Sequence, residues 1–451
     1  MNRNRIWTLL LLALVLGACG KVPRASGPLP QEAYVWQRQW TPAVREAVGR
    51  TSGLSRLVSL GAEVDFRREP VRVARVPLDP ALKAAGRPVG VALRIHTFPG
   101  RFTDSPEAVR RVIRLSQGLA AEARKQGLAL AEIQLDYDCP ESRLDDYPAL
   151  IEAVRNAVRP VPVTVTALPS WLRRERAFER VIAAADGYVL QVHFLDPIAQ
   201  AGDPLILCDP AAARRAVERA ARFRRPFRVA LPTYGYQVVF RADGRRAGVA
   251  AEGAPVLPPP GGTVRTVRSD PEAMAGLVRG WTADRPAALS GILWYRLPSA
   301  GDRLNWPGPT FAAVREGRLP RAEVAAEARS PAPGLIEIDL VNRGEAEAPW
   351  PVLLQIGWTD LRMIAADGLA GYRIDSDGPA GARIERRDRT DVPSRPGDRR
   401  TVAWLRFDGA PAAKEIRIEA LAPSADPRAD RVPRSVPPGW SPALGLRPVH
   451  P

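Results

Sequence analysis

The chain has 451 residues, of which 45% are hydrophobic and 25% are charged, as in a globular protein long enough for two domains. Lysine and arginine outnumber aspartate and glutamate by 65 to 49, which gives a formal net charge of +16 at pH 7. This charge does not indicate a nucleic-acid-binding protein, because the arginines are scattered over predicted helix faces and the N-terminus directs the chain out of the cytoplasm.

The N-terminus has the layout of an export signal. Two arginines precede an apolar run over 6–16, which is shorter than the roughly 20 residues needed to cross a bilayer. The following Leu-Gly-Ala-Cys sequence ends at Cys19 and resembles the cleavage box of bacterial lipoproteins. That resemblance implies a signal peptide over 1–18, lipid on Cys19 and, because Gly20 follows, an outer-membrane location facing the periplasm. An ordinary signal peptide with an incidental cysteine is the alternative.

After a tether over 19–32, apolar runs alternate with segments of helical periodicity as far as about residue 318. Eight strand–helix units in this length predict an α/β fold, a (β/α)8 TIM-like barrel over 33–318. A doubly wound open sheet is the alternative, although no Gly-x-Gly-x-x-Gly turn follows the first strand. Helices should begin at Ser105, as N-cap, and at Asp209. The predicted strands are 33–37, 56–62, 89–97, 131–138, 161–167, 188–194, 227–232 and 291–297.

Two further regions are predicted to be rich in strands. A hairpin insertion near 237–262, with a turn at Asp243-Gly244, follows the seventh strand on the face where barrel active sites lie. Beyond the barrel, strands without intervening helices predict a β-sandwich-like domain over 319–422, followed by a Pro/Arg-rich tail over 423–451. The strands expected in this domain are 335–342, 352–358, 382–386, 400–407 and 415–420.

Acidic side chains stand at the carboxyl end of the fourth predicted strand. Because residues two apart in a strand point to the same side, Asp136 and Asp138 should form a carboxylate pair roughly 6–7 Å apart at Cα. Repulsion between them would raise one pKa and so prepare an acid and a base, as glycoside cleavage requires. We expect Asp138 to be the general acid and Asp136 to orient the sugar or stabilise positive charge. The alternative is a structural ion pair with Arg94.

The residues expected to bind substrate lie on neighbouring strand ends and among nearby aromatic residues. Their polar groups would bind hydroxyl or acidic groups, and their flat rings would pack on sugar faces. They are Arg94, His96, Gln191, His193, Trp36, Trp171, Tyr234, Trp294 and Arg296. Because the sequence lacks a phosphate loop, a nucleophile elbow and more than three histidines, we expect no cofactor and no metal.

Two cysteines remain in the predicted barrel, Cys139 and Cys208. In an oxidising periplasm they could pair, which would tie the loop after the fourth strand to the loop after the sixth. Two buried free thiols are the alternative.

The segment Ile133-Gln-Leu-Asp-Tyr-Asp-Cys-Pro140 resembles the fourth-strand motif of family 18 chitinase-like barrels. In that family the last acidic residue of the motif is a glutamate that protonates the leaving oxygen. Asp136 and Asp138 match the two middle acidic positions. The segment departs from the motif at Ile133, where the first aspartate would be, and at Pro140, where the glutamate would be.

A resemblance over most of 30–310 is to the bacterial envelope lipoprotein family named domain of unknown function 3142. It rests on Tyr34-Val-Trp-Gln-Arg, Leu135-Asp-Tyr-Asp-Cys-Pro, Thr166-Ala-Leu-Pro-Ser-Trp171 and Leu231-Pro-Thr-Tyr-Gly235. It implies a barrel related to glycoside hydrolases and supplies no substrate. We therefore predict a lipid-anchored glycoside-hydrolase-like protein acting on a cell-envelope or exopolysaccharide glycan. The alternative is a non-catalytic glycan-binding or scaffold lipoprotein on a degenerate hydrolase barrel. The expected partners are a polysaccharide or oligosaccharide and, through the lipid, a membrane.

Overall fold

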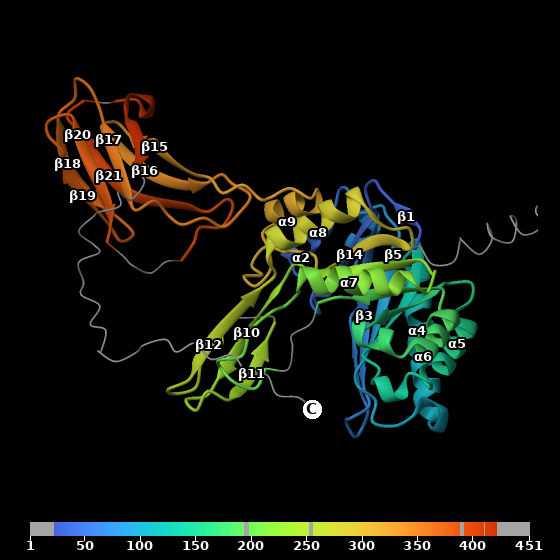
Figure 1. Cartoon of the computed structure of the whole chain (residues 1–451). Coiled ribbons are helices and arrows are strands. Elements are labelled where there is room, and N and C mark those ends of the chain that lie inside the picture. The colour runs from blue at the N-terminus through green and yellow to red at the C-terminus, as the bar shows by residue number, and fades with distance from the viewer. Residues whose placement is uncertain (1–21, 194–197, 252–255, 388–391, 410, 422–451) are drawn as a thin grey trace, which may run out of the picture. The chain divides into compact units, whose positions relative to one another are not determined.

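The computed structural model describes residues 22–193, 198–251, 256–387, 392–409 and 411–421 (Figure 1). Contacts between residues divide the chain into two units. The first unit comprises residues 1–323 together with 344–346, and the second comprises the rest of the chain. The expected signal peptide, Cys19 and the tail over 423–451 lie outside the described residues.

Eight parallel strands form a closed barrel in the first unit. In chain order they are β2 (Gln31–Val35), β3 (Arg56–Asp65), β5 (Val89–Ile95), β6 (Leu130–Tyr137), β7 (Val163–Ala167), β8 (Gly187–Gln191), β9 (Phe227–Pro232) and β14 (Leu289–Tyr295). Each strand pairs with the next, and β2 closes the ring by pairing with both β3 and β14. A further strand, β4 (Arg72–Arg75), pairs antiparallel with β3. The predicted barrel is confirmed, and the alternative of an open sheet is wrong.

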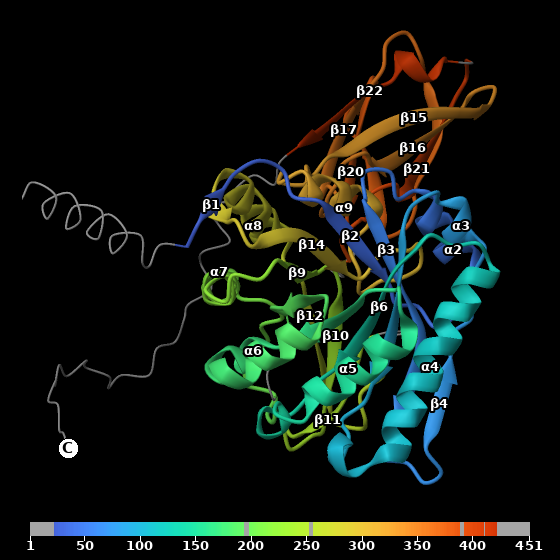
Figure 2. The same cartoon turned by 90° about the vertical axis from the view of Figure 1, so that its right-hand side faces the viewer.

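Amphipathic helices cover the outside of the barrel, where their buried faces pack on the strands. They are α2 (Pro42–Gly49), α3 (Ala81–Ala84), α4 (Pro106–Lys125), α5 (Tyr147–Val158), α6 (Glu175–Ala184), α7 (Pro210–Ala221), α8 (Pro271–Ala283) and α9 (Gly308–Arg315). Figure 2 shows α4, α5 and α6 side by side along the barrel. Asp209 caps α7 by accepting hydrogen bonds from the amides of Ala211 and Ala212. Ser105 occupies the N-cap position of α4 but makes no side-chain cap bond.

The interior of the barrel begins with a layer of buried charge at the amino ends of the strands. Arg228 bonds to Glu132 with two hydrogen bonds and to Glu32 with one, at 2.5 Å. Arg56 lies 3.4 Å from Glu132 on the other side. Buried charges are tolerated where they are paired in this way. Above this layer, towards the carboxyl ends, lies a ring of apolar side chains formed by Val58, Leu60, Ala92, Val189, Ala230 and Leu293.

A three-stranded antiparallel sheet follows the seventh barrel strand. It consists of β10 (Gly235–Phe240), β11 (Arg246–Ala250) and β12 (Thr263–Arg268), with β10 in the centre (Figure 1). The predicted hairpin corresponds to β10 and β11, and its turn has Gly244 at a positive φ of 78°. The third strand, β12, was not predicted from the sequence.

The segment predicted as a tether over 19–32 is partly fixed to the barrel. β1 (Arg24–Ala25) pairs antiparallel with β13 (Arg285–Pro286), which directly precedes β14. Residues 24–25 therefore lie at the amino end of the barrel, opposite the carboxyl ends of the strands. None of the described helices is both long enough and apolar enough to span a membrane.

The second unit consists of two antiparallel sheets. One contains β15 (Val324–Ala332), β16 (Leu335–Asn342), β21 (Arg399–Phe407) and β18 (Met363–Gly368), and the other contains β19 (Tyr372–Ser376), β20 (Gly381–Arg386), β17 (Leu353–Gly357) and β22 (Arg417–Leu421). Both sheets contribute to one apolar core, for example through Ile338 of β16 and Ile356 of β17. The predicted strands of this region are present, and β15, β18 and β19 were not predicted.

Candidate active site

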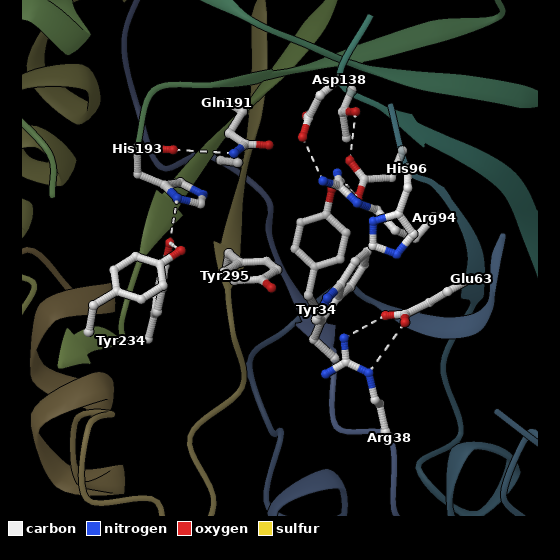
Figure 3. A pocket seen from close by; sticks show the side chains of 15 residues that line it. Tyr34, Arg38, Glu63, Arg94, His96, Asp138, Gln191, His193, Tyr234 and Tyr295 are labelled. Atoms are coloured by element: carbon white, nitrogen blue, oxygen red, sulfur yellow. Dashed lines mark hydrogen bonds and ion pairs between the residues drawn. The ribbon is translucent and has the colours of Figure 1, made fainter. Parts of the chain in front are cut away.

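A pocket of about 410 Å³ opens at the carboxyl ends of the barrel strands (Figure 3). All eight strands, or the residues directly following them, contribute to its wall. Its size is within the range of about 300–1,000 Å³ that is usual for small-ligand sites. The lining residues are Tyr34, Trp36, Arg38, Glu63, Arg94, His96, Asp136, Asp138, Thr166, Gln191, His193, Ala230, Tyr234, Tyr236 and Tyr295.

The two predicted carboxylates lie together on one wall of this pocket and share one guanidinium. Arg94 on β5 is in register with Asp136 on β6. Arg94 Nη1 lies 2.8 Å from Asp136 Oδ2, and Arg94 Nη2 lies 2.5 Å from Asp138 Oδ2. Asp136 also accepts a hydrogen bond of 2.8 Å from Thr166. The predicted carboxylate pair and its alternative, an ion pair with Arg94, are therefore both present.

The two carboxylates differ in their environment. The side chain of Asp136 is 7% exposed and that of Asp138 is 38% exposed, so only Asp138 is readily reached from the pocket. Burial raises the pKa of Asp136, and the charge of Arg94 opposes this rise. The negative charge of Asp138 adds to the rise.

A neutral histidine and several tyrosines form the opposite wall (Figure 3). Burial lowers the pKa of His193 to about 3, so its imidazole is uncharged at pH 7. His193 Nδ1 lies 3.4 Å from Tyr234 Oη, which lies 3.0 Å from Tyr236 Oη. The imidazole also stacks on Tyr295, with ring centroids 5.4 Å apart. Among the described residues, His193 Nε2 has no hydrogen-bond partner although it is buried.

A third carboxylate of the pocket, Glu63, was not identified from the sequence. Glu63 accepts a hydrogen bond of 2.7 Å from Arg38, which follows β2. The predicted second strand ended at residue 62, whereas β3 continues to Asp65. A strand bulge at Gly61 also reverses the alternation of side chains, because Leu60 and Glu63 pair with Ala92 and Arg94 on the same face.

Six of the nine predicted substrate-binding residues line the pocket. They are Arg94, His96, Gln191, His193, Trp36 and Tyr234. Burial, followed by the charge of Arg94, lowers the pKa of His96. Gln191 donates to the backbone oxygen of His193 at 3.2 Å.

Trp171 does not line the pocket as predicted. It lies in a short 3-10 helix, Pro169–Arg173, and is fully buried in the outer core. Its indole nitrogen donates to the backbone oxygen of Cys139 at 3.0 Å. Trp171 therefore supports the loop that follows Asp138 and cannot stack on a ligand.

The predicted orientation of the last strand is also wrong. Tyr295 faces the pocket, so the alternate residue Trp294 points outward, where it packs against Trp306 and Phe311. Arg296 is buried outside the pocket lining and pairs with Asp302 at 2.5 Å. The alternation of Trp294 with Arg296 favours the opposite facing, because both side chains carry hydrogen-bonding groups.

Cys139 and Cys208 are not joined by a disulfide. Both are free thiols, and Cys139 is buried next to the loop supported by Trp171. Burial raises the pKa of each thiol to about 12, so neither is a reactive thiolate at neutral pH. Of the two alternatives, the structure therefore contains the free thiols.

Comparison with protein families confirms the resemblance predicted from the sequence. Residues 85–300 match the family model described as Domain of unknown function (DUF3142), and residues 325–408 match the model described as Domain of unknown function (DUF8456). A search of curated proteins gave no match.

Solved structures similar to this chain include spore cortex-lytic enzymes and chitinases. The spore cortex-lytic enzyme SleL of Bacillus cereus has 12% sequence identity and a TM-score of 0.45, and the match covers 65% of this chain and 75% of SleL. A chitinase from Chromobacterium violaceum has 15% identity and a TM-score of 0.44, with 64% and 98% covered. Chitinase ChiA74 from Bacillus thuringiensis has 11% identity and a TM-score of 0.40, with 87% and 100% covered.

Proposed function

We propose that the barrel pocket binds a glycan of the cell envelope or an exopolysaccharide and cleaves a glycosidic bond. One observation carries this proposal: Asp136 and Asp138 lie side by side on the pocket wall, the first buried and the second accessible. Two carboxylates in unlike environments are the usual equipment for acid-assisted glycoside cleavage.

In this proposal the two carboxylates have different tasks. Because Asp138 is the accessible member, it would act as the general acid and protonate the leaving oxygen of the glycosidic bond. Asp136 is held by Arg94 and Thr166 and would stabilise the positive charge that develops on the sugar ring. In the following step a water molecule would bond to the charged sugar carbon and return a proton to Asp138, which completes the hydrolysis.

The remaining pocket residues suit recognition of a sugar. The rings of Trp36, Tyr34 and Tyr295 pack edge to face, with centroids 5.2–5.6 Å apart, and offer apolar surface to a sugar ring. His96, Gln191 and His193 offer hydrogen-bonding groups for hydroxyls. Few polar groups on an aromatic wall are typical of small-ligand sites.

A second candidate function is glycan binding without cleavage. Two observations favour it: both carboxylates are bonded to Arg94, which stabilises their ionised forms, and Pro140 occupies the position of the glutamate acid of family 18. In that case the pocket would hold a sugar chain for an envelope assembly and would not turn it over.

Incubation with envelope polysaccharides and mass spectrometry of the products separates these candidates. We would use the soluble form that begins after Cys19, its Asp138→Asn variant and, as control, Glu107→Gln, which changes an exposed carboxylate on α4. Shortened products whose formation falls at least about 100-fold in Asp138→Asn alone would support a hydrolase. Retained binding without products would favour the second candidate, and no interaction with any glycan would contradict both.

The proposal places the protein in the cell envelope, attached through lipid on Cys19 and facing the periplasm from the outer membrane. It rests on the Leu-Gly-Ala-Cys sequence and on Gly20 as the second residue of the mature chain. Fractionation of cells after labelling with a radioactive fatty acid tests it. The label should stay with the protein in the outer-membrane fraction, and Cys19→Ala should abolish both the label and the membrane association.

A further inference from the structure

The pocket contains more negative than positive charge among its described lining residues. Its carboxylates are Glu63, Asp136 and Asp138, and its cations are Arg38 and Arg94. Arg38 pairs with Glu63, and Arg94 bonds to both aspartates. Neither histidine of the lining adds positive charge at pH 7, because the pKa of each is lowered by burial. When both aspartates are ionised, the pair therefore carries one negative charge that Arg94 does not balance.

This excess is local and lies where a ligand can reach it. The whole chain has a formal charge of +16, so the anionic pocket does not reflect a generally acidic protein. Of the two aspartates, Asp138 has the more exposed side chain, at 38%. A cationic group of a ligand would therefore meet Asp138 first.

A second, independent feature indicates that the pocket is built for a polar ligand. His193 is 2% exposed, yet its Nε2 atom has no hydrogen-bond partner among the described residues. Leaving a buried polar atom without a partner is costly, and such atoms are rare in folded proteins. Figure 3 places the imidazole of His193 across the pocket from Asp138, so one ligand could contact both side chains.

We infer that the pocket takes a glycan unit with a free, protonated amino group, which binds to Asp138 while His193 Nε2 bonds a hydroxyl of the same sugar chain. This rests on the proposed glycan binding and deepens it by naming the substrate class, amino sugars whose nitrogen is not acylated. An N-acylated sugar would place a neutral amide beside Asp138 and leave the charge of the aspartate pair unbalanced.

Matched oligosaccharides test the inference directly. Calorimetry on the full chain in detergent micelles at pH 6 would compare tetramers of glucosamine, N-acetylglucosamine and glucose, each in the β-1,4 and the β-1,6 linkage. Within a linkage these ligands differ only at one carbon of each ring. We expect the glucosamine tetramer to bind at least about tenfold more tightly than the other two in the preferred linkage, because only it supplies a cation.

Variants test which residue causes the preference for the glucosamine tetramer. Asp138→Asn should bring the affinities of the three tetramers within about twofold of one another, whereas Glu107→Gln should keep the tenfold preference. His193→Phe should weaken all three ligands alike, because the hydroxyl it meets is common to them. If Asp138→Asn fails to fold, the comparison of the three tetramers on the unmodified chain still tests the inference.

The outcomes separate the inference from the proposed function. Equal or weaker binding of the glucosamine tetramer, with the neutral tetramers bound or cleaved, would overturn the inference and leave the proposed function in place. A preference that survives in Asp138→Asn would also overturn it. If no tetramer binds in either linkage, both the inference and the proposed glycan binding fail.

Discussion

Arg228 and Glu132 form a two-bond ion pair inside the barrel, with Arg228 Nη1 2.9 Å from Glu132 Oε1 and Nη2 2.7 Å from Oε2. Both side chains are at most 10% exposed, and Glu32 shares the same guanidinium. Removing the arginine would therefore leave two buried carboxylates with Arg56 as their remaining cationic partner among the described residues. Arg228 therefore compensates the buried negative charge of this layer.

We predict that Arg228→Met lowers the free energy of unfolding by about 3–5 kcal/mol, because uncompensated buried charge is strongly destabilising. Urea denaturation at pH 7 would measure this. Arg110→Met removes an exposed arginine whose ion pair among the described residues is with Glu107 on the same helix, and it should change stability by less than about 0.5 kcal/mol. Equal effects of the two substitutions would contradict the assigned role of the layer.

His193 should make the stability of the barrel depend on pH. Its pKa is about 3 in the folded protein, below the value of about 6.5 expected for an unfolded chain. Between these values the unfolded chain binds a proton that the folded protein does not, so stability falls as the pH falls from 6.5 towards 3. The slope contributed by this residue approaches about 1.4 kcal/mol per pH unit.

His193→Gln should remove this contribution. Denaturation midpoints at pH 7 and pH 4.5 would be compared in both proteins, and the loss of stability should be about 2–3 kcal/mol smaller in the variant. Other groups titrate in both proteins and cancel in the comparison. The same loss in both proteins would mean that His193 is charged in the folded state.

Two glycine substitutions should have opposite effects. A Cβ atom at Gly90 would lie 2.9 Å from Glu132 Cγ and 3.2 Å from Val58 Cγ2, so Gly90→Ala should cost about 1–3 kcal/mol by overpacking the barrel interior. A Cβ atom at Gly118, inside α4, would meet nothing closer than 3.8 Å. Gly118→Ala should therefore stabilise by about 0.5–1 kcal/mol through helix propensity. Thermal unfolding of the two variants checks both signs.

Substitution of Trp36 should affect glycan binding, whereas substitution of Trp171 should affect stability. Trp36→Phe should weaken glycan binding about 2–10-fold, because it reduces the ring surface in the pocket. Trp171→Phe should lower stability by about 1–3 kcal/mol, since it leaves the Cys139 carbonyl without its buried donor. Binding and denaturation assays on both variants would check this. Weaker glycan binding by Trp171→Phe with unchanged stability would mean that Trp171 contacts the ligand.

The barrel could be predicted from the sequence because the alternation of apolar strands with capped helices is local information. The carboxylate pair was predictable for the same reason, since Asp136 and Asp138 are two residues apart in one strand. The position of Glu63 in the pocket was not predictable, because the bulge at Gly61 shifts the alternation of side chains by one residue. The sequence signal for the bulge is Gly61 itself. The structure explains this glycine, because a Cβ atom there would lie 2.5 Å from Leu119 Cδ2.

The facing of the last strand depended on tertiary packing. Trp294 and Arg296 carry hydrogen-bonding groups and are two residues apart, so period-two reasoning placed them, and not Tyr295, on the pocket side. The outward position belongs to Trp294 because Trp306 and Phe311, which follow later in the chain, form its packing partners. A pattern within the strand itself cannot reveal packing partners that lie later in the chain.

The pairing of β1 with β13 determines how a lipidated protein would stand on its membrane. Cys19 precedes Arg24 by five residues, a span of at most about 18 Å when fully extended. Arg24 lies at the amino end of the barrel, and the pocket opens at the opposite end. With lipid on Cys19, this short linker would hold the amino end of the barrel close to the membrane. The pocket at the carboxyl end would then open towards the aqueous compartment. Such a protein would reach polymers crossing that compartment more readily than sugars lying flat on its own bilayer.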